Sequence, residues 1–213
     1  MCLSPNDLLI MESVEGWKYR CKTSICWLNE IWVSELRKYR CFVKTLNKFD
    51  KVIVNVSQSV DAINEVIGEK CVYLPLGIDA MQFCPYPEPS PRLIDVYSIG
   101  RRSEATHRAL LRMVRENNLF YVYDTIDGDR VIDPVEHRLL FANMAKRSKY
   151  FIVNPSKIDS PDETKGQSEF GPRYFEGAAS GAIMIGEYPR NEEFGRNFDW
   201  PDSVIIFPMD LPR

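Results

Sequence analysis

Residues 168–186 read SEFGPRYFEGAASGAIMIG, and the order of loop, helix and strand residues in this stretch decides the fold. Gly171 permits a tight turn, and Pro172 suits a first helical position because that position needs no backbone N–H. The helix is expected to end at Ser180-Gly181, and the apolar run 182–185 then supplies a buried strand. The small residues between them allow the helix to pack closely on a sheet. The stretch therefore predicts an α/β domain.

The start of this predicted helix also carries binding chemistry. Arg173 and Glu176 are three positions apart, so that a cation and a carboxylate share one face of the first turn. The free amides and the positive dipole end favour a phosphate at Gly171, and Arg173 adds a charged donor fork. A carboxylate at Glu176 repels phosphate but accepts from two adjacent hydroxyls, as on a ribose. The alternative is an ordinary amphipathic helix whose Arg and Glu form a solvated surface pair.

The composition excludes several classes of protein. With 213 residues and 45% hydrophobic content, the chain is long enough for one good core or two small ones. A net charge of −3 and a pI near 5.6 argue against nucleic acid as the main partner, because the basic residues are spread along the chain. No stretch approaches the length of a transmembrane span, and the N-terminus lacks a signal-peptide pattern.

The cysteines and acidic residues indicate neither disulfides nor a metal site. The cysteines form no CxxC pair and lie mostly in apolar segments, so that reduced thiols and a cytoplasmic location are expected. His, Cys and carboxylate side chains show no spacing typical of metal ligands, and no metal is expected. The six cysteines are Cys2, Cys21, Cys26, Cys41, Cys71 and Cys84.

Short apolar runs alternate with amphipathic stretches along the whole chain, which is typical of parallel sheets covered by helices. The expected strands are 8–11, 24–28, 52–56, 71–74, 94–99, 120–123, 150–153, 182–185 and 204–207. The expected helices are 33–47, 59–67, 100–117, 134–149 and the one that begins at Pro172. Between strand 150–153 and that last helix, residues 154–167 form a long polar loop at a strand's carboxyl end, where such sheets bind ligands.

A proline-rich run divides the chain. Pro85, Pro87, Pro89 and Pro91 fall in a polar stretch that cannot be helix or central strand, and it reads as a linker. We therefore expect a first Rossmann-like domain at 1–84, a linker at 85–92 and a second domain at 93–213. The phrase PLGID, residues 75–79, ends a strand shortly before the linker.

A second phosphate candidate follows the first strand of the second domain. Gly100-Arg101-Arg102 comes directly after strand 94–99 and opens the next predicted helix, which places Arg101 at a helix start. Arg108 lies one to two turns further on. The alternative is a helix with ordinary polar residues.

PLGID, GRR and FGPRYFEGAASG, in this order, resemble segments of GT-B fold glycosyltransferases of group 1 type, closest to the CgeB-like (spore-maturation) branch. The resemblance spans about residues 24–208 and implies two Rossmann-like parallel-sheet domains, of which the N-terminal one is incomplete. It also implies that Arg101, Arg108, Gly171, Arg173 and Glu176 bind the donor, with Arg108 in place of the family's lysine. The acid before Phe170 stands one residue later than in the family's signature.

The resemblance implies a metal-independent transferase that moves a sugar from a nucleotide-diphosphate donor, such as UDP-sugar, to an unknown acceptor. No cofactor besides this donor substrate is expected. Glu169 is the candidate catalytic residue, while Asn29 and Glu30 lie where the family places a cleft group; both histidines, His107 and His137, lie in the C-terminal half. The alternative is a noncatalytic nucleotide-sugar-binding or interaction module derived from such an enzyme.

Overall fold

The computed structural model describes residues 7–36, 38–124 and 131–207. The chain divides into two compact units, each with its own parallel sheet. The first unit comprises Met1–Leu76 together with Pro161–Glu169, and the second comprises Gly77–Ser160 and Phe170–Arg213. The polypeptide therefore leaves the second unit at Ser160, contributes a short segment to the first unit, and returns at Phe170.

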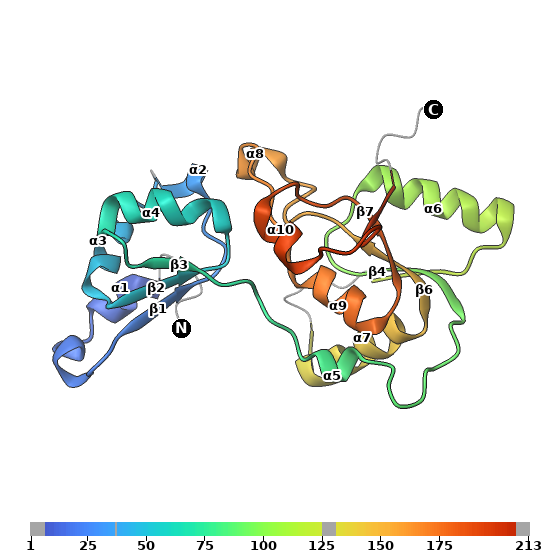
Figure 1. Cartoon of the computed structure of the whole chain (residues 1–213), viewed down its shortest axis with the longest axis horizontal. Helices are drawn as coiled ribbons and strands as arrows, with labels where there is room; N and C mark the ends of the chain where they lie inside the picture. The colour runs from blue at the N-terminus through green and yellow to red at the C-terminus, as the bar shows by residue number, and fades with distance from the viewer. Residues whose placement is uncertain (1–6, 37, 125–130, 208–213) are drawn as a thin grey trace. The chain divides into compact units, whose positions relative to one another are not determined.

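The first unit is built on a three-stranded parallel sheet in the order β1-β2-β3 (Figure 1). Its strands are β1 (Ile25–Leu28), β2 (Lys51–Val54) and β3 (Cys71–Tyr73). Its α-helices are α1 (Asp7–Glu12), α2 (Val33–Leu36), α3 (Arg40–Thr45), α4 (Val60–Ile67) and α8 (Pro161–Thr164). Short 3-10 turns lie at Trp17–Arg20, Leu46–Lys48 and Ser57–Ser59.

Two expectations for this unit are wrong. Residues 8–11 form part of helix α1 and not a strand: Leu8 is buried whereas Ile10 is 66% exposed. An apolar run this short is compatible with the period of a helix and with that of a strand, so that tertiary packing decides which of the two forms. The predicted helix 33–47 is interrupted, because it consists of α2, α3 and a 3-10 turn. The remaining strands and helix α4 lie where the sequence predicts them.

The second unit contains a five-stranded parallel sheet in the order β5-β4-β6-β7-β8. The strands are β4 (Ile94–Ser98), β5 (Tyr121–Tyr123), β6 (Ser148–Val153), β7 (Ile183–Gly186) and β8 (Ile205–Ile206). The helices are α5 (Ala80–Phe83), α6 (Glu104–Asn117), α7 (Pro134–Lys146), α9 (Pro172–Ser180) and α10 (Glu192–Asn197). Sheet and helix positions confirm the predicted α/β class with two parallel sheets, as in Rossmann-like domains.

Helices cover both faces of this second sheet, as Figure 1 shows. Helix α6 packs on one face, where Leu110 joins Val96 and Ile152 in one apolar cluster. Helices α5, α7 and α9 gather on the other face with the larger cluster, which contains Tyr97 and Phe151. Alternate residues of each strand thus face opposite helix layers, as the period of a strand requires.

The chain passes between the units at Leu76 and Gly77, ahead of the proline run. Phe83, which the sequence places in the first domain, is fully buried in the core of the second unit. Its ring lies edge-on to Phe141 of α7, with centroids 5.0 Å apart. Helix α5 is therefore part of the second unit, and the proline run joins α5 to β4.

Helix α9 sits very close to the sheet, as its small residues predict. A Cβ built on Gly177 would lie 2.9 Å from Met184 Cγ and 2.9 Å from Phe151 Cδ1, so that only glycine fits without a shift. The helix begins at Pro172 and is ended by Gly181, whose φ of 65° is left-handed. Both predicted ends of this helix are confirmed.

Four of the described cysteines are free thiols, in agreement with the expectation from the sequence: Cys21, Cys41, Cys71 and Cys84. Burial raises the pKa of the Cys71 thiol to about 11. Within the described residues, every helix is too short or too polar to cross a bilayer.

Candidate functional site

The second sheet has a topological switch point between β4 and β6. The first strand of this unit, β4, lies between the second strand, β5, and the third strand, β6, so that the strand order reverses at this point. Open parallel α/β sheets bind ligands beyond the carboxyl ends of the strands at such a point. At these carboxyl ends lie the turn at Gly100, the start of α9 and the Arg138 side chain of α7.

The turn after β4 approaches the start of α9 closely. Gly100 has a φ of 79°, and its N–H donates to both carboxylate oxygens of Asp124, at 3.0 and 3.1 Å. A Cβ built on Gly100 would lie 3.6 Å from Nη2 of Arg173 and 3.7 Å from its Nε. The Arg173 guanidinium therefore lies within van der Waals reach of the turn, and a side chain at Gly100 would strain the left-handed backbone.

Glu176 joins two arginines from different helices. Its carboxylate is fully buried; Oε1 accepts from Nη1 of Arg138 on α7, and Oε2 accepts from Nη1 of Arg173 on α9. The two arginine side chains keep 36% and 33% of their surface exposed. We call these three residues the Arg138–Glu176–Arg173 cluster. Two guanidinium charges and one carboxylate leave it a net charge of +1.

Aromatic rings hold the two guanidinium groups in place. Both lie over the ring of Phe141, at 5.3 Å for Arg138 and 4.7 Å for Arg173, and Arg138 also lies 4.7 Å from the centroid of Phe83. Planar guanidinium groups stack well on such faces. The two guanidinium groups thus pack against aromatic rings, while about a third of each arginine side chain stays exposed to solvent.

The N-terminus of α9 has no side-chain cap. Its N-cap is Gly171, which has no side chain to accept from the first-turn amides, and the first helical residue is Pro172. The nine-residue helix directs its positive dipole end toward this point. Ser156, in the loop after β6, brings its Oγ within 3.4 Å of a Cβ built on Gly171.

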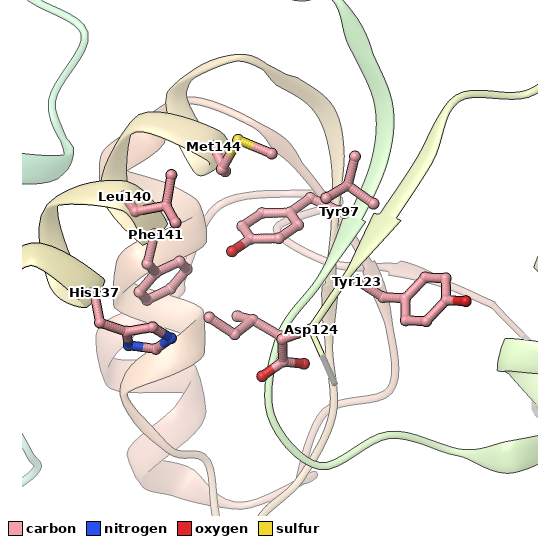
Figure 2. Close-up of a pocket in the computed structure, with 9 residues that line it drawn as sticks. Tyr97, Tyr123, Asp124, His137, Leu140, Phe141 and Met144 are labelled. Carbon is pink, nitrogen blue, oxygen red and sulfur yellow. The ribbon is translucent and has the colours of Figure 1, made fainter. Parts of the chain in front are cut away.

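A pocket of about 240 Å³ lies beside the cluster, between α7 and the ends of β4 and β5. Figure 2 shows Asp124 and His137 at one end of the pocket, Met144 at the other, and the rings of Tyr97 and Phe141 between them. Burial raises the pKa of Tyr97 far above its ordinary value, so that it stays a neutral phenol. The lining is mostly apolar with a few polar groups, which is typical of small-molecule pockets.

The candidate residues at the second unit fall into two groups. Gly171, Arg173 and Glu176 meet at the switch point. Arg101 lies nearby, but its Nη1 donates to Asp159 Oδ1 at 2.9 Å, with Ser160 Oγ at 3.4 Å. Helix α6 begins only at Glu104, after the N-cap Ser103, so that the whole Gly100-Arg101-Arg102 segment is loop.

Arg108 lies elsewhere, on the exposed surface of α6. Its Nε donates to Glu104 Oε1 at 2.8 Å, one turn before it, and the arginine side chain is 76% exposed. The exposed i,i+4 pair is of the kind that contributes little stability.

Glu169 belongs to the first unit. It is 2% exposed, and Oε1 accepts from Ser57 Oγ at 2.6 Å and from Gln58 N at 3.1 Å, at the turn that leads into α4. A carboxylate there satisfies a free backbone N–H and faces the positive end of a helix.

Asn29 and Glu30 follow β1 of the first unit. Glu30 is exposed, has a φ of 57°, and donates its N–H to Asn55 Oδ1 at 2.7 Å. Asn55 in turn donates from Nδ2 to Asn29 Oδ1 at 2.5 Å. These side chains fix the carboxyl ends of β1 and β2.

Sequence reasoning missed Arg138 and Asp124. Arg138 lies within a helix that the sequence predicts, where nothing local distinguishes it from a surface arginine. Asp124 gives a usable signal, since it is the first residue after the second strand of its domain. Acidic residues in that position commonly bind ribose in mononucleotide-binding sheets.

Over residues 7–36, 38–124 and 131–207, no three His, Cys, Asp or Glu side chains are grouped as metal ligands would be. The chain matches no model of a known protein family and no curated protein.

Proposed function

We propose that the second unit binds a nucleoside diphosphate sugar and that the protein is a glycosyltransferase. The observation that carries this proposal is the Arg138–Glu176–Arg173 cluster beside the Gly100 turn, at the switch point of a parallel sheet. The resemblance of the PLGID, GRR and FGPRYFEGAASG segments to GT-B enzymes supports the same reading.

The diphosphate would lie between the Gly100 turn and the start of α9. A site for two adjacent phosphates needs positive charge, forked donors and room for close backbone approach. Arg173 has its guanidinium against Gly100 and its backbone in the first turn of α9, so that it satisfies all three needs. Arg138 adds the second cation, and Arg101 stands on the rim of the same loop.

Such a site would assist transfer through the leaving group. When the bond between sugar and diphosphate breaks, negative charge grows on the diphosphate, and fixed cations and helix dipoles stabilise it. Glu176 would act as a positioning residue, because it fixes both guanidinium groups before the donor arrives. The neighbouring pocket would take the flat ring of the base against Tyr97 and Phe141.

Binding is tested by titration calorimetry with UDP, GDP, uridine and guanosine. We expect a diphosphate to bind far more tightly than its nucleoside, and Arg173→Gln to weaken the diphosphate about 10- to 100-fold, the range of a lost charged hydrogen bond. The nucleoside affinity should stay unchanged, which shows that the fold persists. Arg196→Gln is the matched control, because Arg196 also pairs with glutamates on its own helix but lies on α10.

Turnover is tested by release of UDP or GDP from the corresponding sugar nucleotides in the presence of glycan, protein and small-molecule acceptors. Release that Arg173→Gln abolishes supports the transferase. Tight donor binding without release favours the noncatalytic nucleotide-sugar module. Failure of the unaltered protein to bind any nucleoside diphosphate overturns both.

A further inference from the structure

The ribose of the proposed donor needs an acceptor for its hydroxyl groups, and Glu176 is poorly placed to be that acceptor. Its side chain has 0% exposure, and each of its oxygens already accepts from a guanidinium group. A ribose could reach it only by displacing Arg138 or Arg173. That exchange would replace an ion pair between a guanidinium and a carboxylate with a hydrogen bond from an uncharged hydroxyl, and it would leave one arginine without its carboxylate.

Asp124 has the position that Glu176 lacks. It directly follows β5, the second strand of the unit, and lies 24 residues after Gly100. In mononucleotide-binding parallel sheets, the diphosphate sits at the glycine turn after the first strand, and an acidic residue about 20 residues further on accepts from the ribose hydroxyls. The turn at Gly100 and Asp124 occupy the corresponding positions after the first and second strands of this unit, and the turn has one glycine where the dinucleotide-binding fingerprint has three.

The Asp124 carboxylate has acceptor capacity to spare. A carboxylate offers about four lone-pair positions, and the Gly100 N–H is shared between the two oxygens at 3.0 and 3.1 Å. Arg102 donates to the backbone carbonyl of Asp124 at 2.8 Å, which fixes the residue without engaging its carboxylate. Figure 2 shows the Asp124 carboxylate at the end of the pocket next to His137. It therefore lies between the turn proposed for the diphosphate and the pocket proposed for the base.

We propose that Asp124, and not Glu176, accepts hydrogen bonds from the ribose hydroxyls of the bound nucleotide. This inference rests on the proposed function, because it presupposes a nucleoside diphosphate at the Gly100 turn. It makes Asp124 a binding residue with two tasks: holding the turn through the Gly100 N–H and recognising the ribose. Ribonucleotides are then preferred over nucleotides that lack a ribose hydroxyl.

The test compares affinities for UDP, 2′-deoxy-UDP and 3′-deoxy-UDP, and for the matching guanosine series, by calorimetry on the full chain. The unaltered protein should lose about 10-fold or more in affinity for at least one deoxy analogue, the scale of a hydrogen bond to a charged group. Asp124→Asn should reduce that preference to about threefold or less, whereas Glu176→Gln should retain it. The ratio of the affinities for the ribonucleotide and the deoxynucleotide is measured on one preparation of each protein, so that it does not depend on the folded fraction.

Three results would overturn the inference. The unaltered protein could bind ribo- and deoxynucleotides equally, Asp124→Asn could keep the full preference, or Glu176→Gln could erase it. In each of these cases nucleoside diphosphates still bind, and the proposed function stands. Failure to bind any nucleoside diphosphate is a different result, because it removes the proposed function and the inference together. Asp124→Ser, which also retains an acceptor for the Gly100 N–H, repeats the comparison if Asp124→Asn fails to fold.

Discussion

Arg138 of α7 donates to the buried carboxylate of Glu176 on α9, although the two residues lie 38 positions apart in the chain. This hydrogen bond connects α7 and α9, the two helices that contribute arginines to the candidate site. Since Arg173 holds the second oxygen of the same carboxylate, one buried anion fixes two cations. The geometry of the site and the stability of the second unit therefore depend on the same residue.

Glu176→Gln should lower the free energy of unfolding by about 1–3 kcal/mol, because a neutral amide keeps the shape but loses one charged acceptor for a partly buried guanidinium. Urea denaturation measures the change. Glu192→Gln is the matched control, since Glu192, whose side chain is 77% exposed, pairs with Arg196 on the surface of α10 and should cost less than about 1 kcal/mol. Equal effects of the two substitutions would show that burial of the cluster adds nothing.

Gly177→Ala should destabilise the second unit by about 1–3 kcal/mol, because the added methyl would overlap Met184 and Phe151 at 2.9 Å. Gly195→Ala provides the contrast within the same unit. Gly195 lies in helix α10 with open space around its Cα, and alanine there should be neutral or stabilising by up to about 1 kcal/mol. Thermal unfolding of both variants checks the pair; a stabilising Gly177→Ala would mean that α9 can move away from the sheet.

Local rules account for the parts of the fold that the sequence predicts well. Helix α9 has a proline at its first position and a left-handed glycine after its last, and both signals act over a few residues. Parallel strands that are buried on both faces read as apolar runs, which explains the agreement for β4, β6 and β7.

Contacts over long sequence separations account for what the sequence does not reveal. Glu169 and Ser57 lie 112 positions apart, and nothing near Glu169 indicates that its segment joins the first unit. Arg138 is likewise an ordinary helical arginine until α9 packs beside it. Arg173 and Glu176 could be predicted as a pair because three residues separate them, but the burial of Glu176 depends on the rest of the core.

Glu169→Ala should destabilise the first unit by about 1–3 kcal/mol, because Ser57 Oγ and the Gln58 N–H lose a buried acceptor. Ser57→Ala removes only one of these hydrogen bonds and should cost less. The double variant should cost less than the sum of the two singles, since the residues interact directly. Denaturation of the three variants measures the coupling. A fully stable Glu169→Ala protein that loses turnover would instead support the catalytic role expected from the sequence.

The last prediction concerns pH and His107 of α6. Its Nδ1 lies 3.0 Å from Tyr121 Oη, and its ring lies edge-on to Tyr123 with centroids 4.7 Å apart. Burial, and next the nearby charge of Arg102, lower the pKa of His107 in the folded protein, while Glu104 opposes them.

The sign follows from proton linkage. A depressed histidine pKa means that the unfolded chain binds a proton more readily than the folded protein, so that stability falls as the pH drops below about 6.5. The loss continues down to the folded pKa and then levels off. His107→Gln removes the titrating imidazole but keeps a polar side chain. The free energy of unfolding of this variant should change less between pH 7 and pH 5 than that of the unaltered protein. His137→Gln is the control for an unrelated imidazole. Urea titrations of the three proteins at both pH values measure this change. If the free energy of unfolding of His107→Gln changes between pH 7 and pH 5 as much as that of the unaltered protein, His107 is excluded as the source of the pH dependence.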